Sequence, residues 1–198
     1  MSNKDFKFVS YLWDEEKAKA LAGDEVGLLV YRSNLLGADL RLTNYGGGNT
    51  SCKVASIDPL TKKSVEVMWV KGSGGDLGTM KKEGLAALYL DRLHDLQNIY
   101  KGLAYEDEIV GLYNHCIYDF DSKAPSIDTA LHGLLPFKHI DHVHADAICA
   151  LTNHKNGEKA VKEALGDKFA YVDWIRPGFE LSKQASFLKD AEGIILAH

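Results

Sequence analysis

The sequence has few cysteines and no long hydrophobic run, and both absences narrow the class of protein. Its 198 residues include three cysteines, an odd number, widely spaced and without a C-x-x-C pair. A disulfide framework is therefore not expected, and this pattern is typical of a reduced, cytoplasmic protein. No segment reaches the apolar length that a bilayer requires, and the N-terminus lacks the hydrophobic region of a signal peptide. We expect neither secretion nor membrane insertion.

An excess of positive charge is also absent. The chain carries 23 Lys and Arg against 28 Asp and Glu, which gives a formal charge of -5 and a pI near 5.9. No overall basic field is available to attract nucleic acid or an anionic membrane. A phosphate-bearing ligand must then be bound by local features of the chain.

What remains is the composition of an ordinary globular protein, with 45% hydrophobic and 26% charged residues. The chain has no internal repeat and no Pro- or Ser-rich linker, so we predict a single domain over residues 1–198. The final residues, 193–198, have the pattern of a buried strand that stops without a turn or a polar tail. Domains seldom end on a core strand, so we expect a domain truncated at its C-terminus.

The order of strand and helix patterns predicts an α/β fold. Strands are expected at 40–45, on both sides of a hairpin turn at 58–63, and at 138–144, 169–175 and 193–198. Helices are expected at 14–22, 25–36 and 107–118, from 125, 145, 157 and 178, and over a long segment ending near residue 100. The hairpin makes part of the sheet antiparallel, which argues against a purely parallel, doubly wound fold.

The sharpest local motif is His139-Ile-Asp-His-Val-His144. On a strand, the side chains of His142 and His144 point to one face, where two neutral imidazoles can share a cation. The alternative is a polar strand end whose histidines are hydrogen-bonded within the fold. A metal site needs at least three protein ligands, and the other histidines within reach are His132, His139 and His198.

Two glycine loops are candidates for binding an anion. Residues 46–51 read Gly-Gly-Gly-Asn-Thr-Ser and residues 71–75 read Lys-Gly-Ser-Gly-Gly. Glycines allow several backbone N–H groups to converge on one phosphate, and Lys71 adds a positive charge. Neither loop fits the Walker A pattern, and the second is one residue out of register with the dinucleotide fingerprint. A loose turn is the alternative for the first loop.

A third polar segment, Pro125-Ser-Ile-Asp-Thr129, precedes a short helix. Ser126, Asp128 and Thr129 are all good helix N-cap residues, which is the structural interpretation. The functional interpretation makes Asp128 a general acid or base beside a metal-bound substrate oxygen. Composition does not decide between the two.

Taken in order, these motifs resemble the class II (metal-dependent) aldolase/adducin family. The resemblance rests on Gly-Gly-Gly-Asn-Thr-Ser, Val-Lys-Gly-Ser-Gly-Gly-Asp-Leu-Gly, Pro-Ser-Ile-Asp-Thr and Asp-His-Val-His-Ala-Asp-Ala, and it covers nearly the whole chain. Within the family, the sequence is most similar to the aldolase part of bifunctional rhamnulose-1-phosphate aldolase/lactaldehyde dehydrogenase proteins. It shares with that group the segments 31–40, 176–180 and 193–196.

The resemblance implies a three-layer α/β/α fold with a central mixed, largely antiparallel sheet, a bound Zn²⁺ and a symmetric homo-oligomer, a tetramer. His142 and His144 match the family's metal ligands, and the third ligand is His198 or a residue that follows it. Asp128 stands where simple family members carry a catalytic Glu, and its shorter side chain changes the geometry of proton transfer. The segments that match the phosphate-binding residues contain Asn49, Thr50, Gly72, Ser73 and Ser126.

The activity implied by the resemblance is retro-aldol cleavage of a ketose 1-phosphate, rhamnulose 1-phosphate, to dihydroxyacetone phosphate and lactaldehyde. A sugar-phosphate epimerase or dehydratase is an alternative within the superfamily, because both reactions use the same kind of metal-stabilised enolate. A non-catalytic, adducin-like binding module is an alternative of another class. Adducin-type domains lose the histidines, whereas this chain retains His142 and His144.

Overall fold

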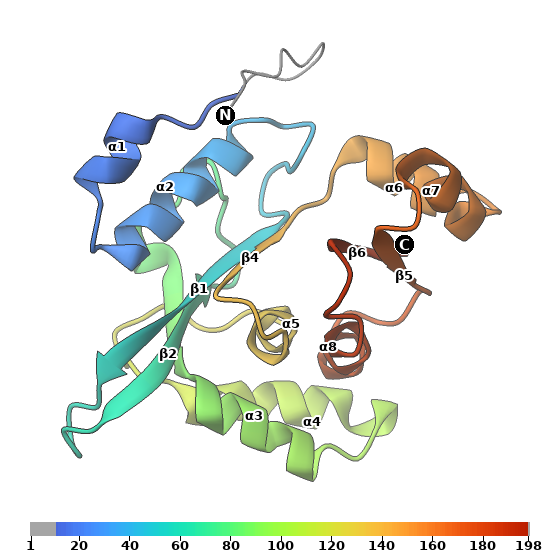
Figure 1. Cartoon of the computed structure of the whole chain (residues 1–198). Helices are drawn as coiled ribbons and strands as arrows, with labels where there is room; N and C mark the ends of the chain where they lie inside the picture. The colour runs from blue at the N-terminus through green and yellow to red at the C-terminus, as the bar shows by residue number, and fades with distance from the viewer. Residues whose placement is uncertain (1–10, 198) are drawn as a thin grey trace.

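A four-stranded antiparallel sheet, of strand order β3-β2-β1-β4, forms the centre of the protein (Figure 1). The structure is a computed structural model, and it describes residues 11–197. Each strand of this sheet runs antiparallel to its neighbours. The strands are β1 (Asn49–Ile57), β2 (Ser64–Lys71), β3 (Leu85–Tyr89) and β4 (His139–His142).

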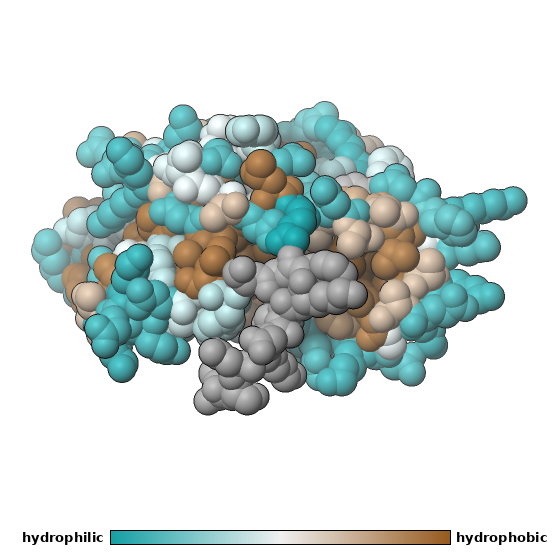
Figure 2. Space-filling view, turned by 90° about the horizontal axis from the view of Figure 1, so that it is seen from above, coloured by the Kyte–Doolittle hydropathy of each residue, from teal (hydrophilic) through white to brown (hydrophobic). Residues whose placement is uncertain are grey.

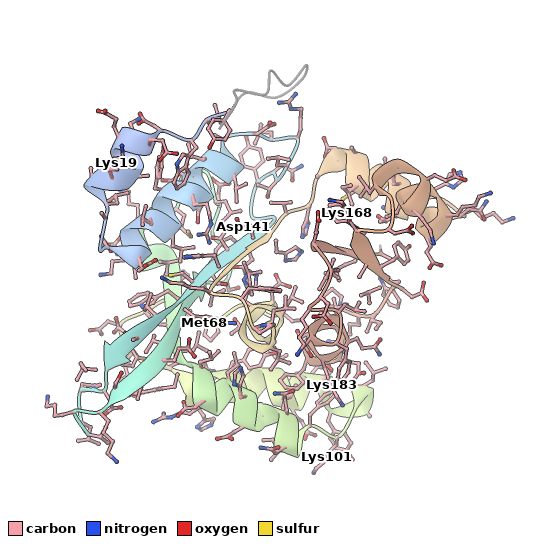
Figure 3. The ribbon with its side chains drawn as sticks, in the orientation of Figure 1. Lys19, Met68, Lys101, Asp141, Lys168 and Lys183 are labelled. Atoms are coloured by element: carbon pink, nitrogen blue, oxygen red, sulfur yellow. The ribbon has the colours of Figure 1, made fainter. Side chains whose placement is uncertain are left out.

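Helices cover both faces of this sheet, because side chains along β2 alternate between two hydrophobic cores. Trp69 packs with α2 (Glu25–Gly37) on one face. Met68 and Val70 pack on the other face against α3 (Leu90–Ile99) and α5 (Thr129–Leu134). Figure 3 shows Met68 between β2 and these helices. The result is a layered arrangement of helix, sheet and helix.

The C-terminal third of the chain forms a second, smaller sheet beside the first. In it, β5 (Phe169–Val172) and β6 (Gly193–Leu196) pair in parallel. Helix α8 (Phe179–Ser186) connects them and packs against α5 through Ala185, Leu131 and Leu135. The remaining helices are α1 (Glu15–Ala20), α4 (Glu106–Gly111), α6 (Asp146–Thr152) and α7 (Gly157–Leu165), with 3-10 turns at Lys82–Gly84, Leu103–Tyr105 and Leu112–Cys116.

The predicted α/β class, with a mostly antiparallel central sheet, is confirmed. The hairpin, the two N-terminal helices and the strand–helix order after residue 125 form within a few residues of their expected positions. The strand expected at 138–144 is shorter and ends at His142. The helix expected at 107–118 is α4 followed by a 3-10 turn.

Two predicted elements are wrong. Residues 40–45 form turns in place of a strand, because the Asp39 carboxylate accepts hydrogen bonds from the backbone and the guanidinium of Arg41. Residues 85–89 form the buried strand β3, not the start of a long helix. A short apolar run is compatible with either state, and pairing with β2 decides for the strand.

The structure also describes the cysteines and the hydrophobic segments. Cys52, Cys116 and Cys149 are all free thiols. Within residues 11–197, no helix has both the length and the apolar character needed to cross a membrane. On the surface shown in Figure 2, hydrophobic side chains form separate patches between hydrophilic ones.

The buried carboxylate of Glu106 connects the C-terminal third of the chain to the hydrophobic core beside α3. Glu106, in α4, is 1% exposed. Its Oε1 accepts a hydrogen bond from the backbone N–H of Phe179 at the start of α8, and its Oε2 accepts one from the Tyr100 hydroxyl at 2.7 Å. Glu106 thereby caps α8 from another helix.

Replacing this carboxylate tests its contribution to stability. Glu106→Gln should lower the free energy of unfolding by about 1–3 kcal/mol. The carboxylate accepts hydrogen bonds with both oxygens, whereas the amide of Gln would place an NH₂ donor against one of the two donor groups. Urea unfolding measures the effect. Glu108→Gln, on the exposed side of the same helix, is the control and should change little. Equal losses of stability in the two variants would contradict this role.

Candidate active site

The two histidines of the H-x-H motif lie side by side at the end of β4. The ring centres of His142 and His144 are 4.9 Å apart, with an angle of 47° between the ring planes. Two imidazoles that bind one metal at about 2.1 Å and at a tetrahedral angle have ring centres roughly 5 Å apart. The pair is thus spaced as two ligands of one cation, although His144 lies two residues beyond the strand.

The pairing of β1 with β4 aligns this end with the first glycine loop. Asn49 lies opposite His142, and Ser51 lies opposite Ile140. Side chains alternate along a strand, so Asn49, Ser51 and His142 share the face toward α5. Thr50 and its partner Asp141 share the opposite face, toward α2.

The first glycine loop packs directly against the histidine pair. Gly48 has a φ of +72°, and a Cβ on it would lie 2.9 Å from the carbonyl oxygen of His142. A Cβ on Gly47 would lie 3.7 Å from Nδ1 of His144. The absence of side chains therefore allows the loop to approach the end of β4. This close approach gives a structural reason for glycine at position 48 at least.

Lys71 links the two glycine loops. Its side chain is buried, and Nζ donates to the carbonyl oxygen of Gly46 at 3.3 Å. Burial lowers the pKa of Lys71, while the negative charges of Asp128 and Asp76 act in the opposite direction. The negative charge of Asp128 thus acts on the ammonium group of Lys71, which lies between the two loops.

The segment before α5 supplies the third part of the site. Nδ2 of Asn49 donates to Oγ of Ser126 at 2.9 Å, and Oδ1 of Asn49 is buried with no hydrogen-bond partner among residues 11–197. Asp128 occupies the N-cap position of α5, but its side chain makes no capping hydrogen bond. The structural interpretation of Asp128 as a cap therefore fails, and its partly buried carboxylate is available for other chemistry.

The remaining residues predicted to bind phosphate differ in how accessible their polar groups are. The Thr50 hydroxyl is fully buried and lies 2.6 Å from Oγ of Ser33, which itself donates to Leu29. The backbone N–H groups of Gly72 and Ser73 donate to Gly84 and Ala124. The Ser73 side chain is exposed. A phosphate contact at this loop would therefore use the Ser73 hydroxyl.

Only two of the candidate metal ligands are brought together in the described structure. Within residues 11–197, no group of three or more His, Cys, Asp or Glu side chains is spaced to hold a metal ion. His198, the candidate third ligand, lies outside these residues. His139 points to the α2 face, where Arg32 contacts it and Asp141. The donor set present, two adjacent imidazoles, fits a zinc-type site that needs a further ligand.

A histidine without an assigned role lies behind the pair. His132, in α5, is fully buried, and its Nδ1 lies 2.8 Å from Oγ of Ser51. Its ring centre is 6.4 Å from that of His142. Burial lowers the pKa of His132, and nearby positive groups lower it further, so the ring is neutral. Sequence spacing alone could not place His132 here, because α5 and β4 meet only through the tertiary fold.

An apolar cleft of about 710 Å³ opens beside the histidine pair. It lies between the end of β4 and the β5–β6 sheet, and both His142 and His144 line it. Most other lining residues are apolar, among them Leu131, Ile140, Val143, Ile148, Leu188 and Ile194. The residues predicted to bind phosphate do not line it, so the histidines stand between a polar region and an apolar one.

Comparison with known proteins identifies the family to which this fold belongs. The sequence profile described as "Class II Aldolase and Adducin N-terminal domain" matches residues 28–198. The chain belongs to this family. It is also 43% identical over 186 residues to a Bacillus subtilis (strain 168) protein named "Uncharacterized oxidoreductase YuxG". That alignment covers 94% of this chain but 26% of the relative, so the chain spans about a quarter of the relative's length.

Solved structures agree with this assignment. The N-terminal class II aldolase domain of a conserved protein from Thermoplasma acidophilum superposes with a TM-score of 0.79 at 29% identity, covering 96% of this chain and 84% of that one. A structure titled L-fuculose 1-phosphate aldolase superposes with a TM-score of 0.55 at 14% identity, covering 88% and 72%. YgbL of Escherichia coli, described as a putative aldolase/epimerase/decarboxylase, gives 0.59 at 15% identity, covering 88% and 74%. The last two similarities concern the fold alone.

The buried Lys53, which lies beneath the site, should make the stability of the protein depend on pH. It lies on β1, is 6% exposed, and donates through Nζ to the carbonyl oxygen of Leu135. Burial lowers the pKa of Lys53 to about 8, from an ordinary value of 10.5. Between these two pH values the unfolded chain binds the proton more tightly than the folded one. The contribution of Lys53 to stability is therefore present above pH 10.5 and is lost as the pH falls through 8.

We expect the stability of the wild type, relative to Lys53→Met, to rise by about 2–3 kcal/mol from pH 8 to pH 10.5. Chemical unfolding of both proteins across this range measures the difference. Lys63→Met, at an exposed position, is the matched control and should run parallel to the wild type. A parallel curve for Lys53→Met as well would show that Lys53 titrates normally.

Proposed function

We propose that this chain carries out metal-dependent retro-aldol cleavage of a ketose 1-phosphate, rhamnulose 1-phosphate, to dihydroxyacetone phosphate and lactaldehyde. The observation that carries the proposal is the alignment of β1 with β4. Asn49, which is bonded to Ser126, lies opposite His142, and Gly47 packs against His144. Groups of the kind that bind phosphate thus adjoin groups of the kind that bind metal.

His142 and His144 would hold Zn²⁺, together with His198 or a residue following it. Bound there, the cation supplies Lewis-acid stabilisation of the negative charge that develops on the substrate when its carbon–carbon bond breaks. Neutral imidazoles suit this role, because a protonated ring cannot bind a cation. The side-by-side rings, 4.9 Å apart, fit this donor set.

Asp128 would move the proton. In the cleavage direction a base must accept the proton of the substrate hydroxyl at the bond that breaks, and the resulting carbanion must later be protonated. The Asp128 carboxylate makes no capping hydrogen bond and interacts electrostatically with the buried Lys71. The carboxylate is therefore available beside the glycine loops, where a general base would be needed.

The phosphate would be bound by neutral donors and one cation. Lys71 supplies the positive charge, and Ser73, Ser126 and Asn49 supply hydrogen-bonding side chains, with Thr50 and Gly72 shaping the loops. Binding the remote phosphate orients the reacting carbons, which converts binding energy into rate. Because the overall charge of the chain is -5, this local arrangement has to supply the attraction.

Two observations support a deoxy-sugar substrate. The cleft beside His142 and His144 is lined mainly by apolar side chains, which suits the methyl end of a 6-deoxy ketose better than a hydroxymethyl group. The Bacillus subtilis relative is much longer than this chain and carries the name of an oxidoreductase. A longer protein of that kind could oxidise the released lactaldehyde.

The remaining parts of the proposal concern assembly and location. By resemblance to the family, we propose a symmetric homo-oligomer, a tetramer, with active sites near subunit contacts. The three free cysteines are consistent with the reducing conditions of the cytoplasm. Sedimentation analysis of the purified chain measures the assembly directly.

The metal part of the proposal makes a direct prediction. His142→Ala and His144→Ala should each abolish stoichiometric zinc, because removing one imidazole leaves too few ligands. Elemental analysis after dialysis against zinc-containing buffer measures the content. His115→Ala, at an exposed position on another element, should bind as much zinc as the wild type. Full zinc content in either site variant would exclude the pair as ligands.

The role of Asp128 is tested separately. Asp128→Asn should lower kcat for rhamnulose 1-phosphate cleavage by about 10²–10⁴-fold, the usual contribution of general acid–base catalysis, while bound metal is unchanged. A coupled assay of lactaldehyde release measures the rate. Asp121→Asn, an exposed carboxylate in the preceding loop, is the control. Wild-type kcat in Asp128→Asn would remove this residue from the mechanism, and bound metal without any wild-type cleavage would favour an epimerase or dehydratase.

A further inference from the structure

His132 is buried at a cost that the fold itself does not explain. The side chain is fully buried in α5, and its Nδ1 pairs with the Ser51 hydroxyl. Its other ring nitrogen, Nε2, has no hydrogen-bond partner among residues 11–197. Leaving a buried polar atom unsatisfied costs about 1–3 kcal/mol, so such an atom calls for a specific explanation.

The ring of His142 is the neighbour of His132 that belongs to the candidate metal site. Ser51 and His142 lie on the same face of the β1–β4 pair, the face that α5 covers. The rings of His132 and His142 have centres 6.4 Å apart, at 43° to each other. His132 therefore lies near both Ser51 and His142.

Two direct roles for His132 are excluded by distance and burial. A shared metal at a tetrahedral angle brings imidazole centres to roughly 5 Å, and the separation of 6.4 Å from His142 is too wide for that. The side chain is 0% exposed, so a substrate cannot touch it. His132 can act on the site only through another residue.

The charge state of His132 fits such an indirect role. Burial is the main reason that its pKa is low, and His142, Lys53, Arg32 and Lys71 add to the effect. A neutral imidazole offers one donor and one acceptor. It can therefore bond to Ser51 with one nitrogen and to a second group with the other, without placing a charge beside the metal site.

We propose that His132 is a positioning residue that bridges the Ser51 hydroxyl to the ring of His142 and fixes the orientation and tautomer of that ring. In metal sites, the ring nitrogen that does not bind the metal is usually hydrogen-bonded to such a partner, which increases affinity. The effect on metal affinity rests on the proposed function, whereas the effect on the His142 ring does not.

The tautomer of His142 is measured first, without metal. Long-range ¹H–¹⁵N NMR spectra of the metal-free protein should show one tautomer of His142 in the wild type. His132→Asn keeps an amide near the position of Nδ1 but cannot reach His142, and should show a mixture of both tautomers. His132→Gln reaches farther and should largely restore one tautomer. An unchanged His142 spectrum in His132→Asn would overturn the proposal.

Metal affinity is measured second, by Zn²⁺ titration in competition with a chromophoric chelator. His132→Asn should weaken binding about 10–100-fold at unchanged stoichiometry, the usual effect of losing such a partner. His132→Gln should lie closer to the wild type. Wild-type affinity in His132→Asn would contradict the positioning role. Loss of stoichiometric binding in both variants would contradict it too, because a positioning residue changes the affinity and not the stoichiometry. If the wild type binds no Zn²⁺, the proposed function is contradicted. The positioning role of His132 is then decided by the tautomer measurement alone.

Two further variants separate positioning from folding. His94→Asn is the control, because His94 is an exposed histidine of α3 whose Nε2 lies 3.0 Å from the carbonyl oxygen of Gly133, the residue after His132 in α5. It should leave zinc affinity and the His142 tautomer unchanged. If His132→Asn does not fold, Ser51→Ala removes the hydroxyl that Nδ1 of His132 contacts and should give the same mixed tautomers with a smaller loss of affinity. No change in Ser51→Ala would then overturn the proposal.

Discussion

The register between β1 and β4 is the constraint on which the site depends. It places Asn49 opposite His142 and Ser51 opposite Ile140, and so assigns alternate side chains to the α5 face and the α2 face. A shift of one residue would turn every one of these side chains to the other face. Gly48 belongs to the same constraint, because a side chain there would collide with the carbonyl of His142.

The two faces have different tasks. On the α2 face, Arg32 contacts Asp141, His139 and the Ser51 carbonyl, and Thr50 contacts Ser33. These contacts hold β4 against β1. On the α5 face, the polar groups are less completely paired, and they include Asn49, His132 and Thr129. Incomplete pairing in a buried layer is typical of a functional site, where the structure forgoes some stability for chemistry.

Much of this arrangement could be predicted from the sequence, because the signals are local. The β1–β2 hairpin follows from alternation around a turn, and the glycine loops and the H-x-H motif are contiguous. The failures have physical causes too. Residues 85–89 are apolar on every side, so only pairing with β2 made them a strand. Residues 40–45 alternate as a strand does, but Asp39 and Arg41 form a turn, and no strand within residues 11–197 pairs with them.

The sequence by itself determined the class of fold, the family and the residue types of the site, since these depend on periodicity and on short motifs. Only the tertiary structure decided which histidines belong together. His139 is nearer to His142 in sequence than His132 is, yet strand alternation turns it to the opposite face, and α5 brings His132 to within 6.4 Å. Whether Asp128 is a helix cap was also decided there, because capping depends on where the carboxylate points and not on its position in the chain.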